Sequence, residues 1–158
     1  MKTATVKELK TELTDRSHQE LIELCLRLSR FKKENKELLT YLLFESTHEE
    51  DYIISIQREI DEQFEMINTT SYYYIKKSIR KILRTIKKYI RYSKNKETEI
   101  ELLLYFCEKL KNFTPSIQNN TVIKNMYHRE TSAIKKKIAV LHEDLQYDYK
   151  LELQKLYF

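Results

Sequence analysis

Residues 71–96 read SYYYIKKSIRKILRTIKKYIRYSKNK and contain ten lysines and arginines but no aspartate or glutamate. Isoleucine recurs in this segment every three or four residues, which is the spacing of one face of an α-helix. At about 100° per residue, most of the cations fall on the side opposite the isoleucines. The segment therefore predicts a long amphipathic helix that buries its isoleucines and presents a strongly basic face.

Eight residues of this segment are candidates for binding an anion or a nucleic acid. Lysine and arginine neutralise phosphates, and tyrosines beside them can stack on unpaired bases. The candidates are Lys77, Arg80, Arg84, Lys87, Lys88, Arg91, Tyr73 and Tyr92. Like charges three or four residues apart on a helix repel by about 0.2–0.5 kcal/mol per pair at low salt, so we expect something to offset this repulsion.

An acidic segment lies just before the basic one and is the first candidate for that role. Residues 45–65 contain eight acidic residues and one basic residue. The expected apolar stripe of this helix is Ile53, Ile56, Ile60, Phe64 and Ile67. If the two apolar stripes face each other, the centres of the charged faces point apart, and only flanking residues can pair. Such residues are Lys76, Lys81, Glu59 and Asp61.

The composition of the whole chain predicts an all-α protein. The 158 residues include no glycine and one proline, Pro115, which leaves almost nothing for tight hairpin turns. We expect a single domain over residues 1–158, built as a bundle of six to eight helices. The predicted helices are 5–13, 18–31, 35–45, 48–67, 71–93, 97–112 and a C-terminal stretch over 116–156.

Local signals support several of these helices. Capping boxes are predicted for the pairs Thr5 and Glu8, Ser17 and Glu20, and Thr47 and Glu50. The segments 21–31 and 100–113 are apolar around most of the helix, so we expect both at the centre of the fold. Thr114 and Pro115 are expected to begin the last stretch. The apolar seam expected along it is Ile134, Ile138, Leu141, Leu145 and Tyr149.

A weak internal sequence similarity leaves a second architecture open. Residues 30–41 resemble residues 91–105, at an offset that drifts from 61 to 64 positions. A duplication of this kind would favour stacked helical hairpins in a short superhelix over a plain bundle. The shared composition of helical segments explains the same similarity without duplication.

No motif in the chain predicts catalysis. Without glycine there is no phosphate-binding loop, dinucleotide fingerprint or nucleophile elbow. The four histidines are isolated from one another, and no spacing of His, Cys or carboxylates indicates a metal site. Cys25 and Cys107 are expected to be buried thiols. We therefore expect no enzyme activity, no cofactor and no bound metal.

The chain has no apolar signal region at its start and no apolar run long enough to cross a membrane, so a cytoplasmic protein is expected. Three quoted segments carry a resemblance: KELK, HQELIELCLRLSRFKKENKELLTYLLFE and SIRKILRTIKKYIRYSKNKETEIELLLYFCEKL. Together they resemble a family of small all-helical bacterial proteins of unknown function. This resemblance implies a bacterial cytoplasmic protein and no particular activity.

Two functional hypotheses follow from the sequence, with an enzyme as a third. The favoured interpretation is a non-catalytic protein-interaction or structural module with one strongly basic helix face. The alternative is a nucleic-acid-binding protein of low sequence specificity that uses this face. The expected partner is accordingly an unknown protein or a nucleic acid. An enzyme would require a pocket where polar side chains distant in sequence converge.

Overall fold

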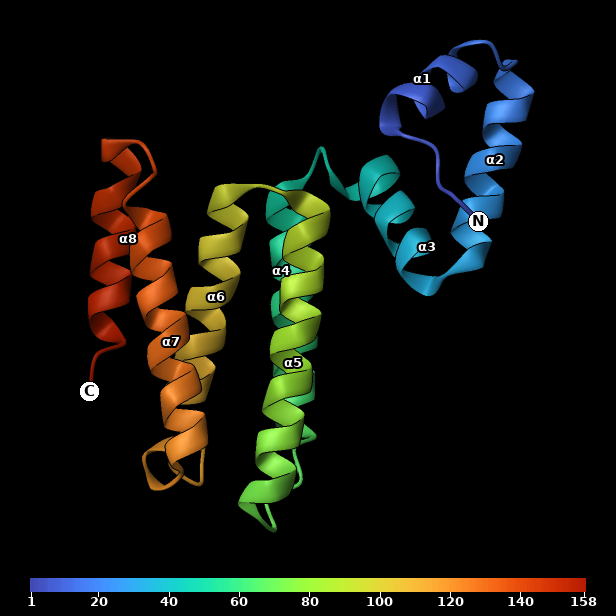
Figure 1. The fold of residues 1–158 in the computed structure, drawn as a ribbon. Coiled ribbons are helices and arrows are strands. Elements are labelled where there is room, and N and C mark those ends of the chain that lie inside the picture. The colour runs from blue at the N-terminus through green and yellow to red at the C-terminus, as the bar shows by residue number, and fades with distance from the viewer. The chain divides into compact units, whose positions relative to one another are not determined.

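The computed structural model describes all 158 residues and contains helices but no strand. The predicted all-α class is confirmed. A π-helical turn spans Tyr41–Glu45 and a 3-10 turn spans Ile117–Asn119. The eight α-helices (Figure 1) are α1 Val6–Thr14, α2 His18–Phe31, α3 Lys33–Thr40, α4 Glu49–Glu65, α5 Tyr72–Ser93, α6 Lys96–Lys111, α7 Thr121–Ile138 and α8 Glu143–Lys155.

By its internal contacts the chain divides into two compact units. The N-terminal unit, Met1–Phe44, holds α1, α2 and α3, and the C-terminal unit, Glu45–Phe158, holds α4 to α8. This division does not decide whether residues 1–158 form a single domain, which stays a prediction. None of the eight helices combines the length and the apolar character that crossing a membrane requires.

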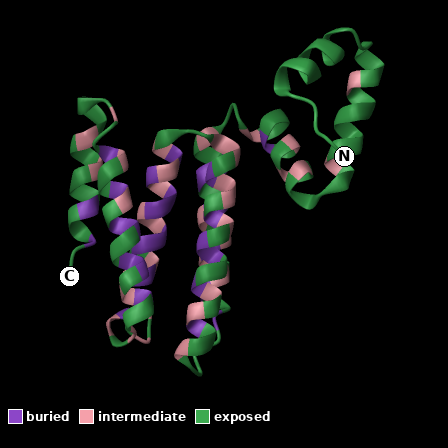
Figure 2. Cartoon of the chain, viewed as in Figure 1, coloured by how far each residue is buried: buried purple, intermediate pink, exposed green.

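Helix α6 is the centre of the C-terminal unit. It packs against α4, α5, α7 and α8, and Figure 1 shows these five helices side by side. Its buried residues include Ile100, Leu103 and Phe106, and Figure 2 shows that buried positions concentrate on α4 to α7. Fully burying one such side chain stabilises the fold by about 1.5–3 kcal/mol. The expectation that residues 100–113 lie at the centre of the fold is confirmed for this unit.

The apolar stripes predicted for α4 and α5 are both buried. On α5 the buried residues are Ile75, Ile79, Ile82, Leu83, Ile86 and Ile90. On α4 and the residues after it they include Ile53, Ile56, Ile60, Phe64 and Ile67. The two helices also share a polar contact, in which the Tyr52 hydroxyl donates a 3.0 Å hydrogen bond to the carbonyl oxygen of Tyr89. Burial of the α5 stripe leaves its cations on the outward side.

The carboxylates of α4 pair with partners other than the flanking lysines named above. Asp61 lies 2.7 Å from the Lys109 ammonium on α6 and accepts a 2.8 Å hydrogen bond from the Tyr105 hydroxyl. Glu59 accepts a 2.9 Å hydrogen bond from the Tyr89 hydroxyl. Burial acts to raise the pKa of Asp61, but the hydrogen bonds from Lys109 and Tyr105 outweigh it and hold this pKa below its usual value. Because α6 packs against α4, its residues Lys109 and Tyr105 reach Asp61, whereas Lys76 and Lys81 do not.

Two of the three predicted capping boxes are confirmed. Thr5 with Glu8 and Ser17 with Glu20 exchange both expected hydrogen bonds. The third is wrong, because α4 begins one residue later than predicted and His48 holds the cap position. The Thr47 hydroxyl lies 2.9 Å from His48 Nδ1 and is engaged there.

The predicted C-terminal stretch is divided into separate elements. Thr114 and Pro115 precede the 3-10 turn, and α7 begins after Asn120, whose side chain accepts hydrogen bonds from two backbone amides. His142 caps α8, and its side chain accepts a hydrogen bond from the backbone amide of Asp144. Because the chain turns between α7 and α8, the expected seam is interrupted: Ile134 and Ile138 are buried, whereas Leu145 is exposed. Helix α8 instead buries Leu153, and Leu156 follows it into the core.

The N-terminal unit has almost no buried interior. Among residues 1–44 only Tyr41 is buried, and α2 has no buried residue (Figure 2). The expectation that residues 21–31 lie at the centre of the fold is therefore wrong. Within this unit α2 packs mainly on α3, and a chain of this size cannot surround a helix that is apolar on every side. The prediction of two buried thiols is confirmed for Cys107, which is buried, but is wrong for Cys25, which is exposed.

Candidate anion-binding groove

An open groove of about 740 Å³ lies among α5, α6 and α7 in the C-terminal unit, and we call it the basic groove. Its apolar floor is formed by Leu83, Ile90, Leu103, Met126 and Ala133. Six cationic side chains line it: Arg80, Arg84, Lys87, Arg91, Arg129 and Lys137. Two carboxylates line it as well: Glu99 and Glu130.

The spacing of residues on α5 explains why four cations reach this groove together. Arg80, Arg84, Lys87 and Arg91 follow one another at intervals of four, three and four residues, which keeps them on one side of the helix. At a rise of 1.5 Å per residue they extend over about 16 Å. The burial of the isoleucine stripe fixes the rotation of α5, and this rotation turns the four cations toward α7.

Each groove carboxylate is already paired with a lysine. Glu130 Oε1 lies 2.9 Å from Lys87 Nζ, and Glu99 Oε1 lies 2.7 Å from Lys137 Nζ. Glu130 is buried, and a buried carboxylate needs a charged or hydrogen-bonding partner to offset its lost hydration. Lys87 supplies that partner, so the positive charge of Lys87 is largely neutralised by Glu130.

Four arginines keep their charge available in the groove. Arg80, Arg84 and Arg91 are exposed and form no ion pair. Arg129 approaches Glu130 only through Nε, at 3.7 Å, and its side chain is 71% exposed. A guanidinium group offers a planar fork of donors that matches two oxygens of one phosphate. The groove therefore presents cations that suit an anion with several phosphates.

The structure brings together half of the residues that the sequence nominated. Arg80, Arg84, Lys87 and Arg91 line the groove, whereas the other four nominated residues do not. Lys77 is exposed and lies outside the lining. Lys88 Nζ lies 5.0 Å from the centroid of the Tyr89 ring, in a cation–π contact.

The two nominated tyrosines lie against other tyrosines. The Tyr73 ring lies edge-on to Tyr74, with centroids 5.3 Å apart, near the start of α5. The Tyr92 ring centroid lies 6.1 Å from that of Tyr89. Stacking of bases on these rings would take place outside the basic groove.

Sequence reasoning missed the contribution of α7. Residues 97–158 contain nine basic and nine acidic residues, so their net charge is zero and does not indicate a basic surface. Yet Arg129, Ala133 and Lys137 are spaced at four-residue intervals and share one helix face. That spacing was the available signal, but only the packing of α7 on α6 shows that this face meets the cations of α5.

A buried thiol lies close to the groove carboxylate. Burial raises the pKa of Cys107 to about 12, with a further rise from the negative charge of Glu130 and a smaller opposing effect from Lys87. Cys107 therefore stays a neutral thiol at physiological pH. No group of three or more His, Cys, Asp or Glu side chains is placed to hold a metal ion.

In a second hollow of the C-terminal unit, of about 390 Å³, several polar groups are paired within the protein. The Tyr149 hydroxyl donates a 2.9 Å hydrogen bond to Glu101, which raises the Tyr149 pKa together with the larger effect of burial. Lys111 Nζ donates to the backbone carbonyls of Lys155 and Tyr157. These contacts fix α8 to α6, whereas the basic groove keeps unpaired cations.

Comparisons with protein-family models, curated proteins and solved structures found no match to this chain. The resemblance to a family of small all-helical bacterial proteins stays a prediction. The geometry and charge of the basic groove are therefore the features that indicate a function.

Proposed function

We propose that this non-catalytic protein binds nucleic acid with low sequence specificity through the basic groove. The observation that supports it is the row of Arg80, Arg84 and Arg91, which carry no ion pair and face Arg129 across an open groove. Uncompensated like charges so close together are costly, and a phosphate backbone would relieve that cost. The bacterial cytoplasmic location expected from the sequence belongs to this proposal.

Low specificity follows from the kind of contact the groove offers. Arginines that grip phosphates position a nucleic acid but do not identify its bases. The groove floor is apolar, with Leu83, Leu103 and Met126, and offers no hydrogen bond to a base edge. Affinity is therefore expected to depend more on salt than on sequence.

The protein-interaction module favoured by the sequence is kept as a second candidate function. The observation behind it is separate from the groove, because it concerns the exposed apolar side chains of residues 1–44. The two functions use different parts of the chain and are compatible with each other.

The proposal is tested by fluorescence anisotropy with short single- and double-stranded DNA and RNA over a range of salt concentrations. Each neutralised phosphate contributes about −0.9 to the slope of log K against log salt on duplex DNA and about −0.7 on single strands. Three or four arginine contacts therefore predict a slope of about −2.7 to −3.6 on duplex DNA. Absence of binding at low salt, or a slope near zero, would reject the proposal.

A substitution that frees a paired cation should strengthen binding. Glu130→Gln keeps the size of the side chain but removes the charge that now pairs with Lys87. The slope on duplex DNA should steepen by about 0.9, which corresponds to an affinity gain of up to about eightfold at 0.1 M salt. Glu62→Gln, at an exposed position of α4 outside the groove, makes the same charge change and serves as the control. Equal gains from both variants would mean that net charge matters and the groove does not.

A further inference from the structure

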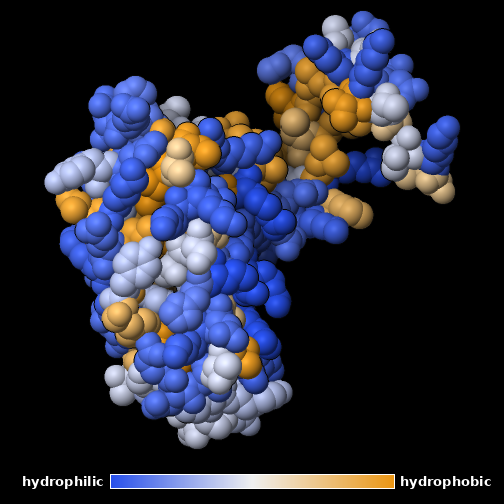
Figure 3. All heavy atoms as spheres, turned by 60° about the vertical axis from the view of Figure 1, so that its left-hand side comes forward, coloured by the Kyte–Doolittle hydropathy of each residue, from blue (hydrophilic) through white to orange (hydrophobic).

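Helix α2 leaves an apolar surface uncovered in the N-terminal unit. A groove of about 690 Å³ lies between α1 and α2, and Leu9 and Leu13 of α1 face Leu24 and Leu28 of α2 across it. All four side chains are exposed. Figure 3 shows hydrophobic residues gathered on this unit with hydrophilic residues around them. We call this feature the apolar groove.

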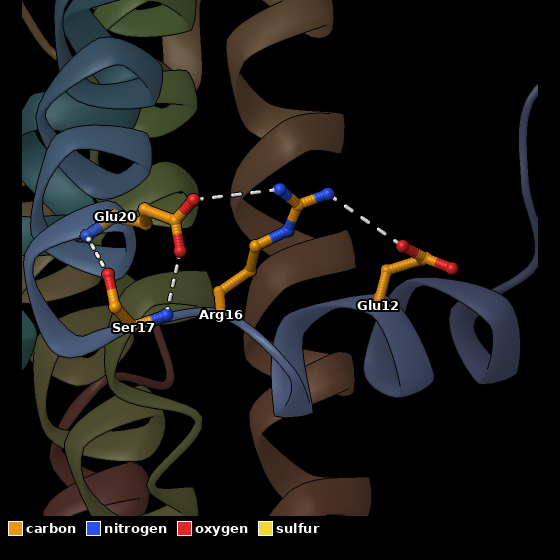
Figure 4. Close-up of polar contacts among 4 residues, drawn as sticks. All are labelled: Glu12, Arg16, Ser17 and Glu20. Carbon is orange, nitrogen blue, oxygen red and sulfur yellow. Dashed lines mark hydrogen bonds and ion pairs between the residues drawn. The ribbon is translucent and has the colours of Figure 1, made fainter.

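Local polar contacts hold the two walls of the apolar groove in place. Arg16, in the turn between the helices, lies 3.8 Å from Glu12 on α1 and 3.7 Å from Glu20 on α2. Glu20 also completes the capping box with Ser17. Figure 4 shows the Arg16 guanidinium between the two carboxylates. The corner is thus formed by residues of the connection itself, and the apolar walls remain open to a partner.

The charges along α2 indicate what kind of partner fits. Glu20 and Glu23 occupy its first half, and Arg27 and Arg30 occupy its second half. At about 100° per residue, these four residues share one edge of the helix, next to the face of Leu24 and Leu28. Arg27 and Arg30 form no ion pair within the protein, so their charges remain available along this edge.

An edge that is acidic in its first half and basic in its second half is complementary to itself in the antiparallel direction. In an antiparallel helix pair the same edge of each helix meets its counterpart. Glu23 of one copy then lies opposite Arg27 of the other, and Glu20 lies opposite Arg30. Both pairings have the same midpoint, residue 25, so a single two-fold axis brings the glutamates of each helix opposite the arginines of the other.

We propose that a second copy of this chain covers the apolar groove, with the two α2 helices packed antiparallel about a two-fold axis near residue 25. The size of the unit supports this proposal. A 44-residue unit with one buried residue cannot supply its own core, and oligomerisation is an established way for so small a unit to gain one. The proposal is independent of nucleic-acid binding.

The first test compares two aliphatic residues, Leu24 and Ile22, which are equally exposed but lie on opposite sides of α2. The mass of the full chain is measured in solution over a range of concentrations, and we expect twice the 19.3 kDa of one chain. Leu24→Glu, on the apolar groove, should weaken the dimer by about 30-fold or more, as expected for an interface hot spot. Ile22→Glu is the matched control, since Ile22 and Leu24 are both 40% exposed but Ile22 lies on the far side of α2.

The second test uses surface charges, which leave folding intact. Arg27→Glu alone places Glu23 opposite a glutamate, and Glu23→Arg alone places Arg27 opposite an arginine, so each variant should dimerise about tenfold more weakly. An equal mixture of the two variants should recover wild-type dimerisation, because every opposed pair is then of opposite sign. A monomeric wild-type chain, a dimer that withstands Leu24→Glu, or a mixture that does not recover would overturn the proposal.

Discussion

Replacing Arg80, Arg84 and Arg91 together by glutamate is expected to weaken nucleic-acid binding by about 500-fold or more at 0.1 M salt. Each lost phosphate contact on duplex DNA lowers log K by about 0.9 at this salt concentration relative to 1 M. Three lost contacts therefore account for the estimate, and the new negative charges add repulsion to it. The slope of log K against log salt should become shallower by about 2.7.

This result can be separated from a loss of folding. All three arginines are exposed, so their removal breaks no internal ion pair or hydrogen bond. Glutamates at these positions lie three or four residues from remaining lysines of α5, and such pairs stabilise a helix by about 0.2–0.5 kcal/mol each. The variant should therefore be at least as stable as the wild type, as judged by urea denaturation.

A matched control tests whether position matters. Arg58→Glu makes the same chemical change at an exposed site on α4, outside the basic groove. It should reduce affinity only slightly, through its effect on net charge. The matched comparison is the single variant Arg84→Glu, and if it binds as tightly as the Arg58→Glu variant, the basic groove is not the binding site.

The sequence was sufficient to predict the basic face of α5, because the position of that face depends only on the helical spacing of residues within α5. The buried isoleucines fix which side of the helix points outward, so the exposure of Arg80 and Arg84 follows from spacing alone. The pairing of Lys87 does not follow, because Glu130 lies 43 residues away and reaches it only when α7 packs on α6 and lines the same groove as α5. Contacts of this range depend on tertiary packing, which periodicity does not specify.

The same distinction explains the errors at α2 and in the C-terminal stretch. The apolar pattern of α2 indicates correctly that the helix needs cover, but it does not say whether that cover is the same domain or another molecule. In the C-terminal stretch, Asn120 and His142 end up as helix caps, although neither matches the S/T-x-x-E pattern used to place helix starts. Pattern reasoning thus located apolar faces better than it located their partners or boundaries.

Phe106→Ala is expected to lower the free energy of unfolding of the C-terminal unit by about 3–5 kcal/mol. Phe106 is fully buried on α6, and its ring centroid lies 6.0 Å from that of Phe64 on α4. Because α6 contacts four other helices, few neighbours can move into the cavity without losing contacts elsewhere. A loss of this size is a large share of the 5–15 kcal/mol that typically stabilises a domain.

The measurement is urea denaturation followed by circular dichroism, with Tyr147→Ala as the control, since Tyr147 is 68% exposed and should change stability by at most about 0.5 kcal/mol. A loss under about 1 kcal/mol for Phe106→Ala would contradict the central position of α6. Phe106 does not line the basic groove. The Phe106→Ala chain should therefore keep wild-type affinity for nucleic acid wherever it is still folded, whereas the triple arginine variant should keep its fold and lose that affinity. This opposite behaviour of the two variants separates the core that positions the groove from the charges that act in it.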